Sequence, residues 1–365
     1  MAHKGEADGV LIFPAGMPDG LAFRDRARAL GLRVVGASSV HADPARDAYD
    51  AWEALPYVSD PGFDAALAAV VKRHDIGAIH APHFVVWRHL SERLHEIAPG
   101  ARLSGDDRPE DHERAYRDLR TRMSAPLTFE FAPAFPPQPP LSLVELAGLV
   151  RLVDTIPGMC AEHKMRAIVE VMRHAPRGDV VEIGSWWGRS AALFVWLARR
   201  YDIGDVLCVD PWMSDAMPQG DALLDKTSAD LDTEEALRMF EINLAPLAAG
   251  RLNYVRARAE NAAGSYGPGL KVRTEAFGET SYEGRIAVLH IDGNHAEHHA
   301  ALDTALWTPH VVPGGWIIFD DYDWAFGDGP KKVADAFVSA NEARIATVFQ
   351  AGPSLFLQLK DDARG

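Results

Sequence analysis

Cysteine is scarce in this chain of 365 residues, which contains only Cys160 and Cys208. Two cysteines give neither a disulfide framework nor the paired spacing of a zinc site, so we expect both to be reduced and partly buried. Long apolar runs are also missing, because no stretch approaches the roughly 20 apolar residues that a membrane-spanning helix needs. The first ten residues, MAHKGEADGV, lack the apolar segment of a secretory signal. These absences predict no membrane partner and, by elimination, a cytoplasmic protein.

Positive charge is in deficit as well. The chain has 37 Lys and Arg residues against 52 Asp and Glu residues, which gives a net charge of −15. So acidic a chain, without a long Lys/Arg run, repels a phosphate backbone, and we therefore expect no nucleic-acid partner. The composition, 47% hydrophobic and 24% charged, is typical of a soluble globular protein. The length favours two domains.

Strand-like and helix-like segments alternate in the N-terminal third. GVLIFPAG, LRVVGASS and IGAIHAP have the pattern of buried strands, and helical periodicity fills the segments between them. This βαβαβ pattern predicts a Rossmann-like domain over residues 1–124. Residues 125–141 follow with six prolines, which exclude a regular element and indicate an extended linker.

The same alternation resumes over residues 142–365. Apolar runs such as DVVEIGS, DVLCVDPW, RLNYVRARA, RIAVLHIDG and GGWIIFDDYD alternate with helical segments. ATVFQAGPSLFLQL adds two closing strands, in the form of an antiparallel hairpin around Gly352-Pro353. We therefore predict an α/β protein with two Rossmann-like domains, the second built on a mostly parallel seven-stranded sheet.

The segment VVEIGSWWGRSA reads as a strand, a tight turn and the start of a helix. Gly184 allows the turn, Gly188 permits close approach of a ligand, and Ser190 can cap the helix. The motif is neither G-x-G-x-x-G nor a P-loop. Asp210 ends the next strand, where it can accept hydrogen bonds from both hydroxyls of a ribose or can cap the segment that follows.

VVEIGSWWGRSA followed by VLCVDPW resembles the class I S-adenosylmethionine-dependent methyltransferases, and is most similar to the catechol-type and macrolide-sugar O-methyltransferases. The resemblance covers about residues 142–360. It implies that S-adenosylmethionine is the cofactor, that Asp210 holds its ribose and that Ala259 and Glu260 lie near its adenine. It also implies that the Gly184 turn and its neighbours contact the methionine part of the cofactor. These residues are Glu182, Gly184, Ser185, Gly188 and Ser190.

Three acids follow two strands of the second domain. Asp292 ends the strand 286–291, while Asp320 and Asp321 end the next one. The carboxyl ends of neighbouring parallel strands lie about 5 Å apart, so these side chains can converge. Clustered carboxylates need a counter-charge, and a hard cation such as Mg²⁺, Ca²⁺ or Mn²⁺ supplies it. The alternative is that the acids only cap the following helices. Metal-dependent members of the family that the chain resembles carry acids at these positions.

Those members also place a basic residue three positions after the first acid, and here that residue is His295. We expect His295 to act as the general base and Asp292 to serve the reaction as a metal ligand that helps to activate an acceptor hydroxyl. The predicted reaction is Mg²⁺-dependent O-methylation of a sugar-like or natural-product acceptor. The alternatives are a metal-dependent hydrolase or hydroxylase that uses Asp292, His295 and Asp320, or a non-catalytic scaffold. His295 could also be an exposed helix-start residue.

Other segments carry weaker indications. Residues 211–232 read either as a lid beside the cofactor or as a disordered insertion, and residues 264–285 as a loop-rich insertion near the acceptor. Trp324 and Phe326 could wall the acceptor pocket or belong to the core. The N-terminal domain resembles the lead domain of ATP-grasp proteins. Nucleotide binding, acceptor binding and a dimer surface all stay open for it, and so does homo-oligomer formation.

Overall fold

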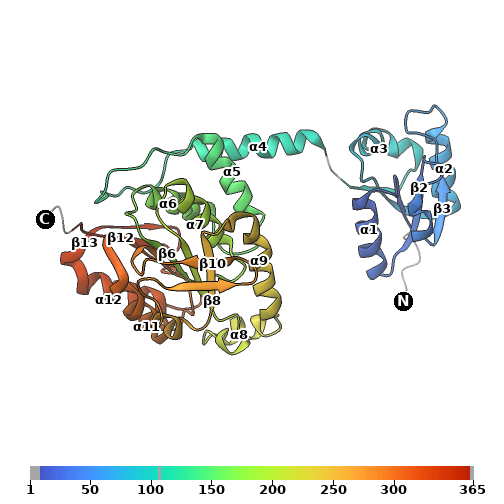
Figure 1. Ribbon diagram of the computed structural model, residues 1–365. Helices are drawn as coiled ribbons and strands as arrows, with labels where there is room; N and C mark the ends of the chain where they lie inside the picture. Colours follow the sequence, from blue (N-terminus) through green and yellow to red (C-terminus); the bar gives the residue numbers. More distant parts are fainter. Residues whose placement is uncertain (1–8, 106–107, 362–365) are drawn as a thin grey trace. The chain divides into compact units, whose positions relative to one another are not determined.

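The computed structural model describes residues 9–105 and 108–361. The chain divides into two compact units, residues 1–119 and residues 120–365, each with its own sheet (Figure 1). Helix α4, Pro109–Ser124, contains the position at which the first unit ends and the second begins.

The N-terminal unit is a five-stranded parallel sheet in the order β3-β2-β1-β4-β5. Its strands are β1 Gly9–Ile12, β2 Arg33–Ser38, β3 Ala51–Ala54, β4 Ile76–His80 and β5 Arg102–Ser104. Its elements outside the sheet are α1 Pro18–Ala29, η1 Pro44–Ala48, α2 Phe63–Arg73, α3 Phe84–Ile97 and the first part of α4. The three strands predicted from the sequence are the central ones. The two edge strands were missed because segments of three and four residues are too short to show a pattern.

The C-terminal unit contains a seven-stranded sheet in the order β13-β14-β12-β11-β6-β7-β8. The strands are β6 Asp179–Ile183, β7 Val206–Asp210, β8 Leu252–Arg256, β11 Ile286–Ile291, β12 Val311–Phe319, β13 Ile345–Ala351 and β14 Ser354–Leu359. β14 runs antiparallel to both of its neighbours, so the sheet is mixed, and the other pairings are parallel. The predicted hairpin closes this sheet.

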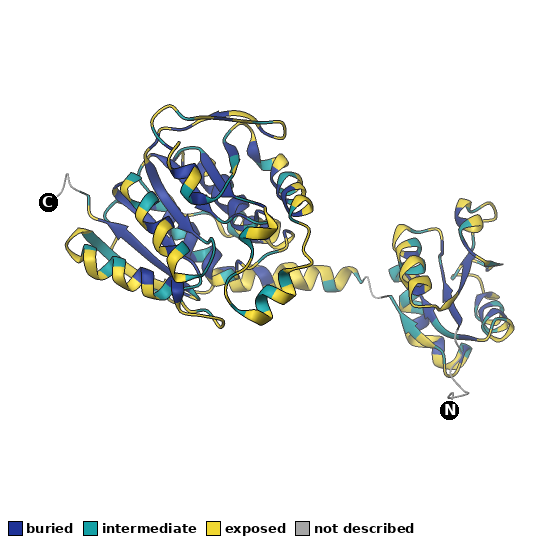
Figure 2. Ribbon diagram, turned by 90° about the horizontal axis from the view of Figure 1, so that it is seen from below, coloured by how far each residue is buried: buried dark blue, intermediate teal, exposed yellow. Residues whose placement is uncertain are grey.

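Helices cover both faces of this sheet, with α6 and α7 on one face and α11 and α12 on the other (Figure 1). The helical elements are α5 Leu143–Asp154, α6 Glu162–Arg173, α7 Arg189–Arg200, η2 Ser214–Ala216, α8 Ala222–Ser228, α9 Thr233–Ala248, α10 Ala259–Ala263, α11 Glu297–Trp307, η3 Thr308–His310, α12 Gly329–Asn341 and η4 Glu342–Arg344. The five inner strands, β14, β12, β11, β6 and β7, are buried along nearly their whole length, as expected for a sheet covered on both faces (Figure 2). The edge strands β13 and β8 are partly exposed.

Strand alternation decides which side chains lie on each face of this sheet. Val181, Ile183, Leu289 and Ile291 belong to the core under α11 and α12. Their odd-numbered positions leave the even-numbered residues of β6, and of β11 from Val288 onward, for the opposite face, because successive side chains of a strand alternate. This is the face that α6 and α7 cover.

The proline-rich segment 125–141 packs onto the C-terminal unit. Phe131 stacks on Phe349 with ring centroids 5.0 Å apart, and its edge meets Trp316 at 5.5 Å. The backbone N–H of Ala134 donates to Gln358 at 2.7 Å. The segment is extended, as its prolines predict, and these aromatic contacts fix it against the end of the sheet that holds β12 and β13.

The segment 264–285 differs from the sequence prediction. It forms a two-stranded antiparallel hairpin, β9 Lys271–Thr274 and β10 Gly278–Ser281. Asn253 of β8 donates from its side chain to the carbonyls of Val272 and Gly278, at 2.9 Å each, and so ties the hairpin to the sheet edge. No helix in the described parts of the chain is long and apolar enough to cross a bilayer.

Candidate active site

A cavity of about 420 Å³ opens at the carboxyl ends of β6, β7, β11 and β12. This is the edge at which open α/β sheets bind their ligands. Ten of the predicted site residues line it: Gly184, Ser185, Ser190, Asp210, Ala259, Glu260, Asp292, His295, Asp320 and Asp321. Glu182 and Gly188 do not line it.

Gly184 forms the turn that ends β6, with a φ of +80°. A Cβ atom at this position would overlap the carbonyl oxygen of Asp292 and lie 2.9 Å from the Cα of Gly293. Only glycine lets the β6 turn come this close to the loop after β11. Gly184 therefore brings the turn of the first motif against the first acid of the predicted metal site.

Three other backbone positions around the cavity have unusual conformations. Trp186, Trp212 and Asp321 line it with φ values of +43°, +41° and +50°. Left-handed backbone is costly for residues other than glycine and gathers at functional sites. The hydroxyl of Ser185 is buried there without a hydrogen-bond partner among the described residues. These features support the cavity as the functional site of the C-terminal unit.

Asp210 does more than the sequence indicates. Its Oδ2 accepts from the backbone N–H groups of Ser185 and Trp186 at 2.9 Å, and its Oδ1 accepts from Trp212 at 2.8 Å. Burial raises the pKa of this carboxyl, and the three backbone donors oppose that rise. A carboxylate offers about four acceptor positions. One is left, so the carboxyl could take one ribose hydroxyl and not the predicted two.

Glu182 and Gly188 have structural positions rather than the predicted contact with a ligand. Glu182 is fully buried under the sheet edge, where its Oε1 lies 3.0 Å from Nδ1 of His290. Gly188 has a φ of +87°, and a Cβ there would press on Phe240 and Leu244 of α9. Glu182 lies inside β6 and not at its end, so its side chain stays below the cavity beside its strand neighbour His290.

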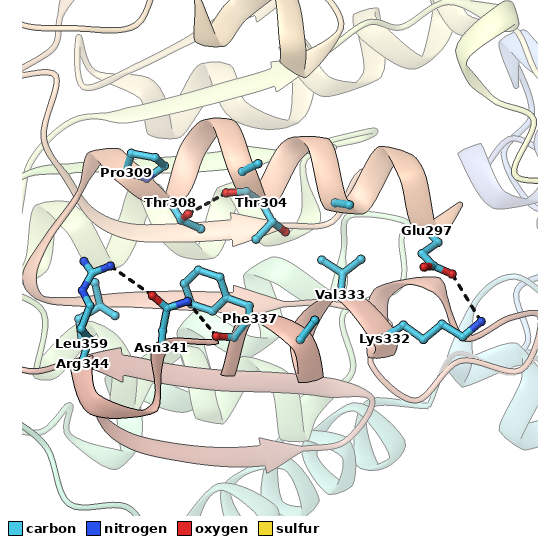
Figure 3. A pocket seen from close by; sticks show the side chains of 13 residues that line it. Glu297, Thr304, Thr308, Pro309, Lys332, Val333, Phe337, Asn341, Arg344 and Leu359 are labelled. Carbon is cyan, nitrogen blue, oxygen red and sulfur yellow. Dashed lines mark hydrogen bonds and ion pairs between the residues drawn. The ribbon is translucent and has the colours of Figure 1, made fainter. Parts of the chain in front are cut away.

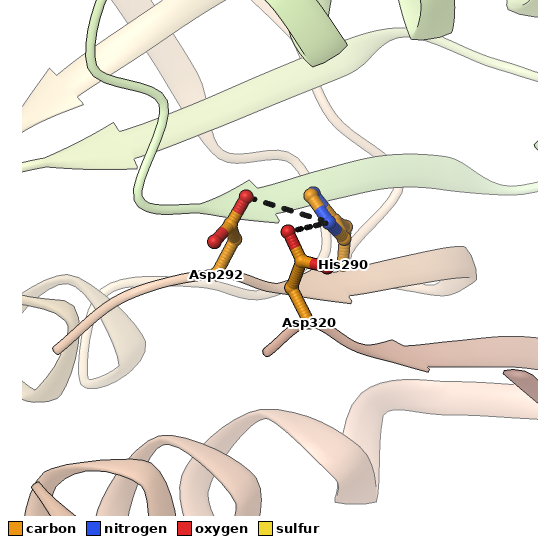
Figure 4. A group of neighbouring side chains, drawn as sticks. All are labelled: His290, Asp292 and Asp320. Carbon is orange, nitrogen blue, oxygen red and sulfur yellow. Dashed lines mark ion pairs between the residues drawn. The ribbon is translucent and has the colours of Figure 1, made fainter. Parts of the chain in front are cut away.

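Asp292 and Asp320, which line the cavity, come together beside the buried ring of His290 (Figure 4). The Nε2 of His290 lies 3.7 Å from Asp292 and 3.9 Å from Asp320, and it has no hydrogen-bond partner among the described residues. Asp320 also contacts the ammonium of Lys164 through Oδ2 and the hydroxyl of Ser354 through Oδ1. The Lys164 ammonium is 3.5 Å from Asp292.

The two carboxyls share this environment unequally. Burial and the charge of Asp320 raise the pKa of Asp292 well above its ordinary value. Burial acts in the same direction on Asp320, but the charges of Lys164 and His290 outweigh it and hold the pKa of Asp320 below its ordinary value. Burial alone would lower the pKa of Lys164, and the two carboxylates reverse this and raise it. The arrangement favours the charged forms of Asp320 and Lys164, and it makes Asp292 harder to ionise than Asp320.

Asp321 faces a different partner from its neighbour Asp320. Its Oδ2 lies 2.9 Å from Nε2 of His295, and the Nδ1 of that ring is buried without a hydrogen-bond partner among the described residues. Trp324 packs edge-on against the ring, with centroids 4.3 Å apart. Asp321 can thus hold one ring nitrogen protonated and leave the other as an acceptor. Trp324 supports His295 and, like Phe326, does not line the cavity.

The three predicted metal ligands therefore come together as two overlapping groups that share Asp292. One group is His290, Asp292 and Asp320, and the other is Asp292, His295 and Asp321, with potential ligand atoms within 4.8 Å of one another in each. Three carboxylates face one ammonium, so two negative charges are unbalanced when all are ionised. A divalent cation matches this deficit and the oxygen and imidazole donors. The residues present fit such an ion.

The segment 211–232 covers part of the cavity. The cavity is lined there by Met213 and Met217, which flank η2, and by Leu224 of α8. The side-chain amide of Asn294 donates to the carbonyl of Pro218 at 2.7 Å, which fastens this segment to the loop that carries Asp292. The sequence left open whether this segment is a lid or a disordered insertion. In the structure it contains η2 and α8 and borders the cavity.

A second group of polar residues lines the other end of the cavity. Glu260, His299 and Asp303 are among its lining residues. The side chain of Asp303 is buried, and burial together with the charge of Glu260 raises its pKa to about 7. Asp303 makes no side-chain hydrogen bond to another described residue, so this end also offers a polar group to a ligand.

A larger hollow of about 720 Å³ lies between α11 and α12 (Figure 3). An ion pair between Glu297 and Lys332, 3.4 Å apart, lies at one end, and a contact from Arg344 to Asn341 at 3.2 Å lies at the other. None of the predicted site residues lines it. Among the described residues, no group of acids and histidines within ligand distance lies there, so the chemistry is assigned to the first cavity.

Lys164 and His290 were missed by sequence reasoning. His290 stands two residues before Asp292, which directly follows β11, so alternation alone places both on one face. Lys164 precedes Ile168 and Val171 of α6 by four and seven residues, and that spacing puts it on the buried side of the helix. Both signals were present, but neither indicates which carboxylates the side chains would meet.

Residues 181–322 match a family model described as a methyltransferase domain. The protein is a methyltransferase. The matched segment runs from β6 to just beyond β12 and contains the Gly184 turn, Asp210 and all three acids. The match favours methyl transfer over the hydrolase or hydroxylase chemistry that the acids alone leave open.

Solved structures similar to this methyltransferase include several O-methyltransferases. The O-methyltransferase NovP is 18% identical, with 60% of this chain and 82% of that chain covered and a TM-score of 0.37. The calicheamicin methyltransferase CalS11 is 14% identical, with 69% and 94% covered and a TM-score of 0.38. MycE, from the mycinamycin biosynthetic pathway and in complex with Mg, SAH and mycinamycin VI, is 14% identical, with 78% and 64% covered and a TM-score of 0.30. No curated protein matches the chain significantly.

Proposed function

We propose that this methyltransferase transfers a methyl group from S-adenosylmethionine to a hydroxyl of a sugar-like or natural-product acceptor, with a divalent cation, Mg²⁺ in the first instance, at Asp292, Asp320 and Asp321. The observation that carries the proposal is that Asp292, Asp321 and His295 converge on the wall of the same cavity as the Gly184 turn. A cofactor site and a proton acceptor therefore share one space.

The cavity has suitable groups for each part of the cofactor. Ser185, with its unpartnered hydroxyl, and Ser190 lie at the Gly184 turn, where we place the methionine part. The remaining acceptor position of Asp210 suits one ribose hydroxyl. Ala259 and Glu260, at the start of α10, border the end proposed for adenine. S-adenosylmethionine supplies an electrophilic methyl group on a sulfonium.

His295 is the proposed general base. A hydroxyl is a poor nucleophile while it is protonated, and a divalent cation beside it lowers its pKa. Asp321 holds Nε2 of the ring, so Nδ1 can accept the hydroxyl proton as the oxygen attacks the methyl group. The chain's largest contribution is to hold the acceptor oxygen in line with the methyl group.

The lining of the cavity supports an acceptor with a substantial apolar surface. Beyond the acids, Met159, Trp186, Met213, Met217 and Leu231 border it. Such a wall suits a hydroxyl carried on a natural product better than a small free sugar, since methionine and tryptophan side chains stabilise apolar surface.

Two measurements test the proposal on the full-length protein. Calorimetry should show that S-adenosylhomocysteine binds to the wild type and to Asp292→Asn with similar affinity. With S-adenosylmethionine, MgCl₂ and a panel of phenolic and glycosidic alcohols, the wild type should release S-adenosylhomocysteine and the variant should not. Failure of the wild type to bind S-adenosylhomocysteine, or equal turnover by the variant, would contradict the assignment.

A further inference from the structure

Lys164 is the only lysine that is buried among the described residues, with 1% of its surface exposed. Its ammonium touches Asp320 and lies 3.5 Å from Asp292, beneath the cavity and on the α6 side. Burying an ammonium costs several kcal/mol unless carboxylates surround it. The helix therefore delivers a fixed positive charge to the base of the proposed cation site.

This charge changes what Asp320 can offer to a cation. One of its oxygens contacts Lys164 and the other contacts the hydroxyl of Ser354. Asp292 has only longer contacts, to Lys164 at 3.5 Å and to His290 at 3.7 Å. Asp321 contacts Nε2 of His295, and the Nδ1 of that ring has no partner among the described residues. Asp320 is thus the acid most strongly committed to the protein, and Asp292 and Asp321 are the ones free to turn toward an ion.

The charge of Lys164 also sets the net charge of the site that binds the ion. With Lys164 in place, three ionised carboxylates leave a charge of −2 around the site. A neutral side chain at position 164 would leave −3, which favours an ion of higher charge. At about 6 Å and an effective dielectric constant of about 20–40, one unit of charge alters an affinity by roughly ten- to hundredfold for each unit of charge on the ion.

We propose that Lys164 is a positioning residue that sets the charge selectivity of the cation site: its ammonium holds Asp320 and lowers the site's negative charge, so that divalent ions are favoured over trivalent ones. This inference rests on the proposed function, because it requires a cation at Asp292, Asp320 and Asp321. It concerns the choice of ion, and methyl transfer itself is not needed to observe it.

The experiment compares Ca²⁺ with Tb³⁺, two ions that have similar radii and prefer oxygen ligands but differ in charge. Tb³⁺ luminescence can be excited through Trp324, whose ring contacts His295, and Ca²⁺ can be titrated as a competitor. The quantity measured is the ratio of the two affinities. Loss of packing or of ligand geometry weakens both ions alike and leaves this ratio unchanged, whereas loss of the ammonium favours Tb³⁺ selectively.

The variants are Lys164→Met, which removes the charge, and Lys164→Gln, which removes it but keeps a donor for Asp320 in case the first variant does not fold. Lys164→Arg keeps the charge and is the matched control. We expect the Tb³⁺-to-Ca²⁺ affinity ratio to rise at least about tenfold in the neutral variants and to change little in Lys164→Arg.

Two results would overturn the inference and can be told apart. If the wild type binds Ca²⁺ and Asp292→Asn does not, but the neutral Lys164 variants keep the wild-type ratio, the role of Lys164 is wrong and the cation site stands. If the wild type binds neither ion, or Asp292→Asn binds them equally well, the cation site itself is wrong and the role of Lys164 fails with it.

Discussion

Replacing Gly184 with alanine should damage both the stability and the cation site of the C-terminal unit. Gly184 has a φ of +80°, and an added Cβ would overlap the carbonyl oxygen of Asp292 and lie 2.5 Å from its carbonyl carbon. These are backbone atoms, which cannot rotate away as the end of a long side chain can. The loop that carries Asp292 must therefore shift, or the β6 turn must open.

The cost has two parts. Left-handed backbone costs an alanine about 1–2 kcal/mol that a glycine does not lose. Forcing an extra carbon into a filled space costs about 1–3 kcal/mol more. Together these predict a loss of about 2–5 kcal/mol in the free energy of unfolding. The same shift displaces Asp292, so affinity for a divalent cation should fall as well.

Urea unfolding followed by tryptophan fluorescence measures the first effect, and a Mn²⁺ titration measures the second. Gly148→Ala is the matched control, because Gly148 lies inside α5 with nothing within 4 Å of an added Cβ. That variant should be more stable than the wild type by about 0.5–1 kcal/mol. If Gly184→Ala unfolds within about 1 kcal/mol of the wild type and binds Mn²⁺ normally, the close approach of the two loops is wrong.

Three further changes have defined outcomes. Burial raises the pKa of Asp303 to about 7 from an ordinary 3.8, so the folded protein holds a proton that the unfolded chain loses, and the stability falls as pH rises from about 4 to about 7. In urea unfolding, the stability of Asp303→Asn relative to the wild type should therefore increase by about 2–3 kcal/mol when the pH is raised from 5 to 8. A stability difference that does not change with pH would refute the raised pKa. His295→Gln should lower kcat about 10²–10⁴-fold and leave the affinity for S-adenosylhomocysteine unchanged. His298→Gln, at the exposed start of α11, should keep the wild-type kcat. Equal kcat values in the two variants would show that His295 is not the base. Phe131→Ala should lower the free energy of unfolding by about 2 kcal/mol, because it removes the stack on Phe349. Val144→Ala, at a position 76% exposed, should stay within about 0.5 kcal/mol of the wild type. Similar free energies for the two variants would mean that the proline-rich segment contributes little to stability.

The sequence predicted the fold wherever a segment carries its own periodicity. The apolar runs of β6, β7, β11 and β12 are buried on both faces, and a parallel strand of that kind reads as a continuous hydrophobic run. The reversed direction of β14 followed from the short turn at Gly352. The hairpin of β9 and β10 was missed because its strands are four residues each and largely polar.

In the candidate site, too, some features could be predicted from the sequence and others could not. Acids at the ends of strands could be predicted to meet, because the edge of a parallel sheet brings strand ends together whatever their separation in sequence. The contact of Lys164 with Asp320 joins residues 156 positions apart, and it depends on how α6 packs across the sheet. The bonds from Ser185 and Trp186 to Asp210 depend on the shape of a turn, and no spacing in the sequence encodes that shape.

Binding of Mn²⁺ measured by electron paramagnetic resonance tests the central claim most directly, because Mn²⁺ substitutes for Mg²⁺ among oxygen ligands. The titration is made on the full-length wild type and on Asp292→Asn in the presence of S-adenosylhomocysteine. One tightly bound Mn²⁺ per chain in the wild type, lost in the variant and displaced by excess Mg²⁺, is the predicted result. A wild type that binds no Mn²⁺, or a variant that binds it as tightly, would contradict a cation at Asp292, Asp320 and Asp321.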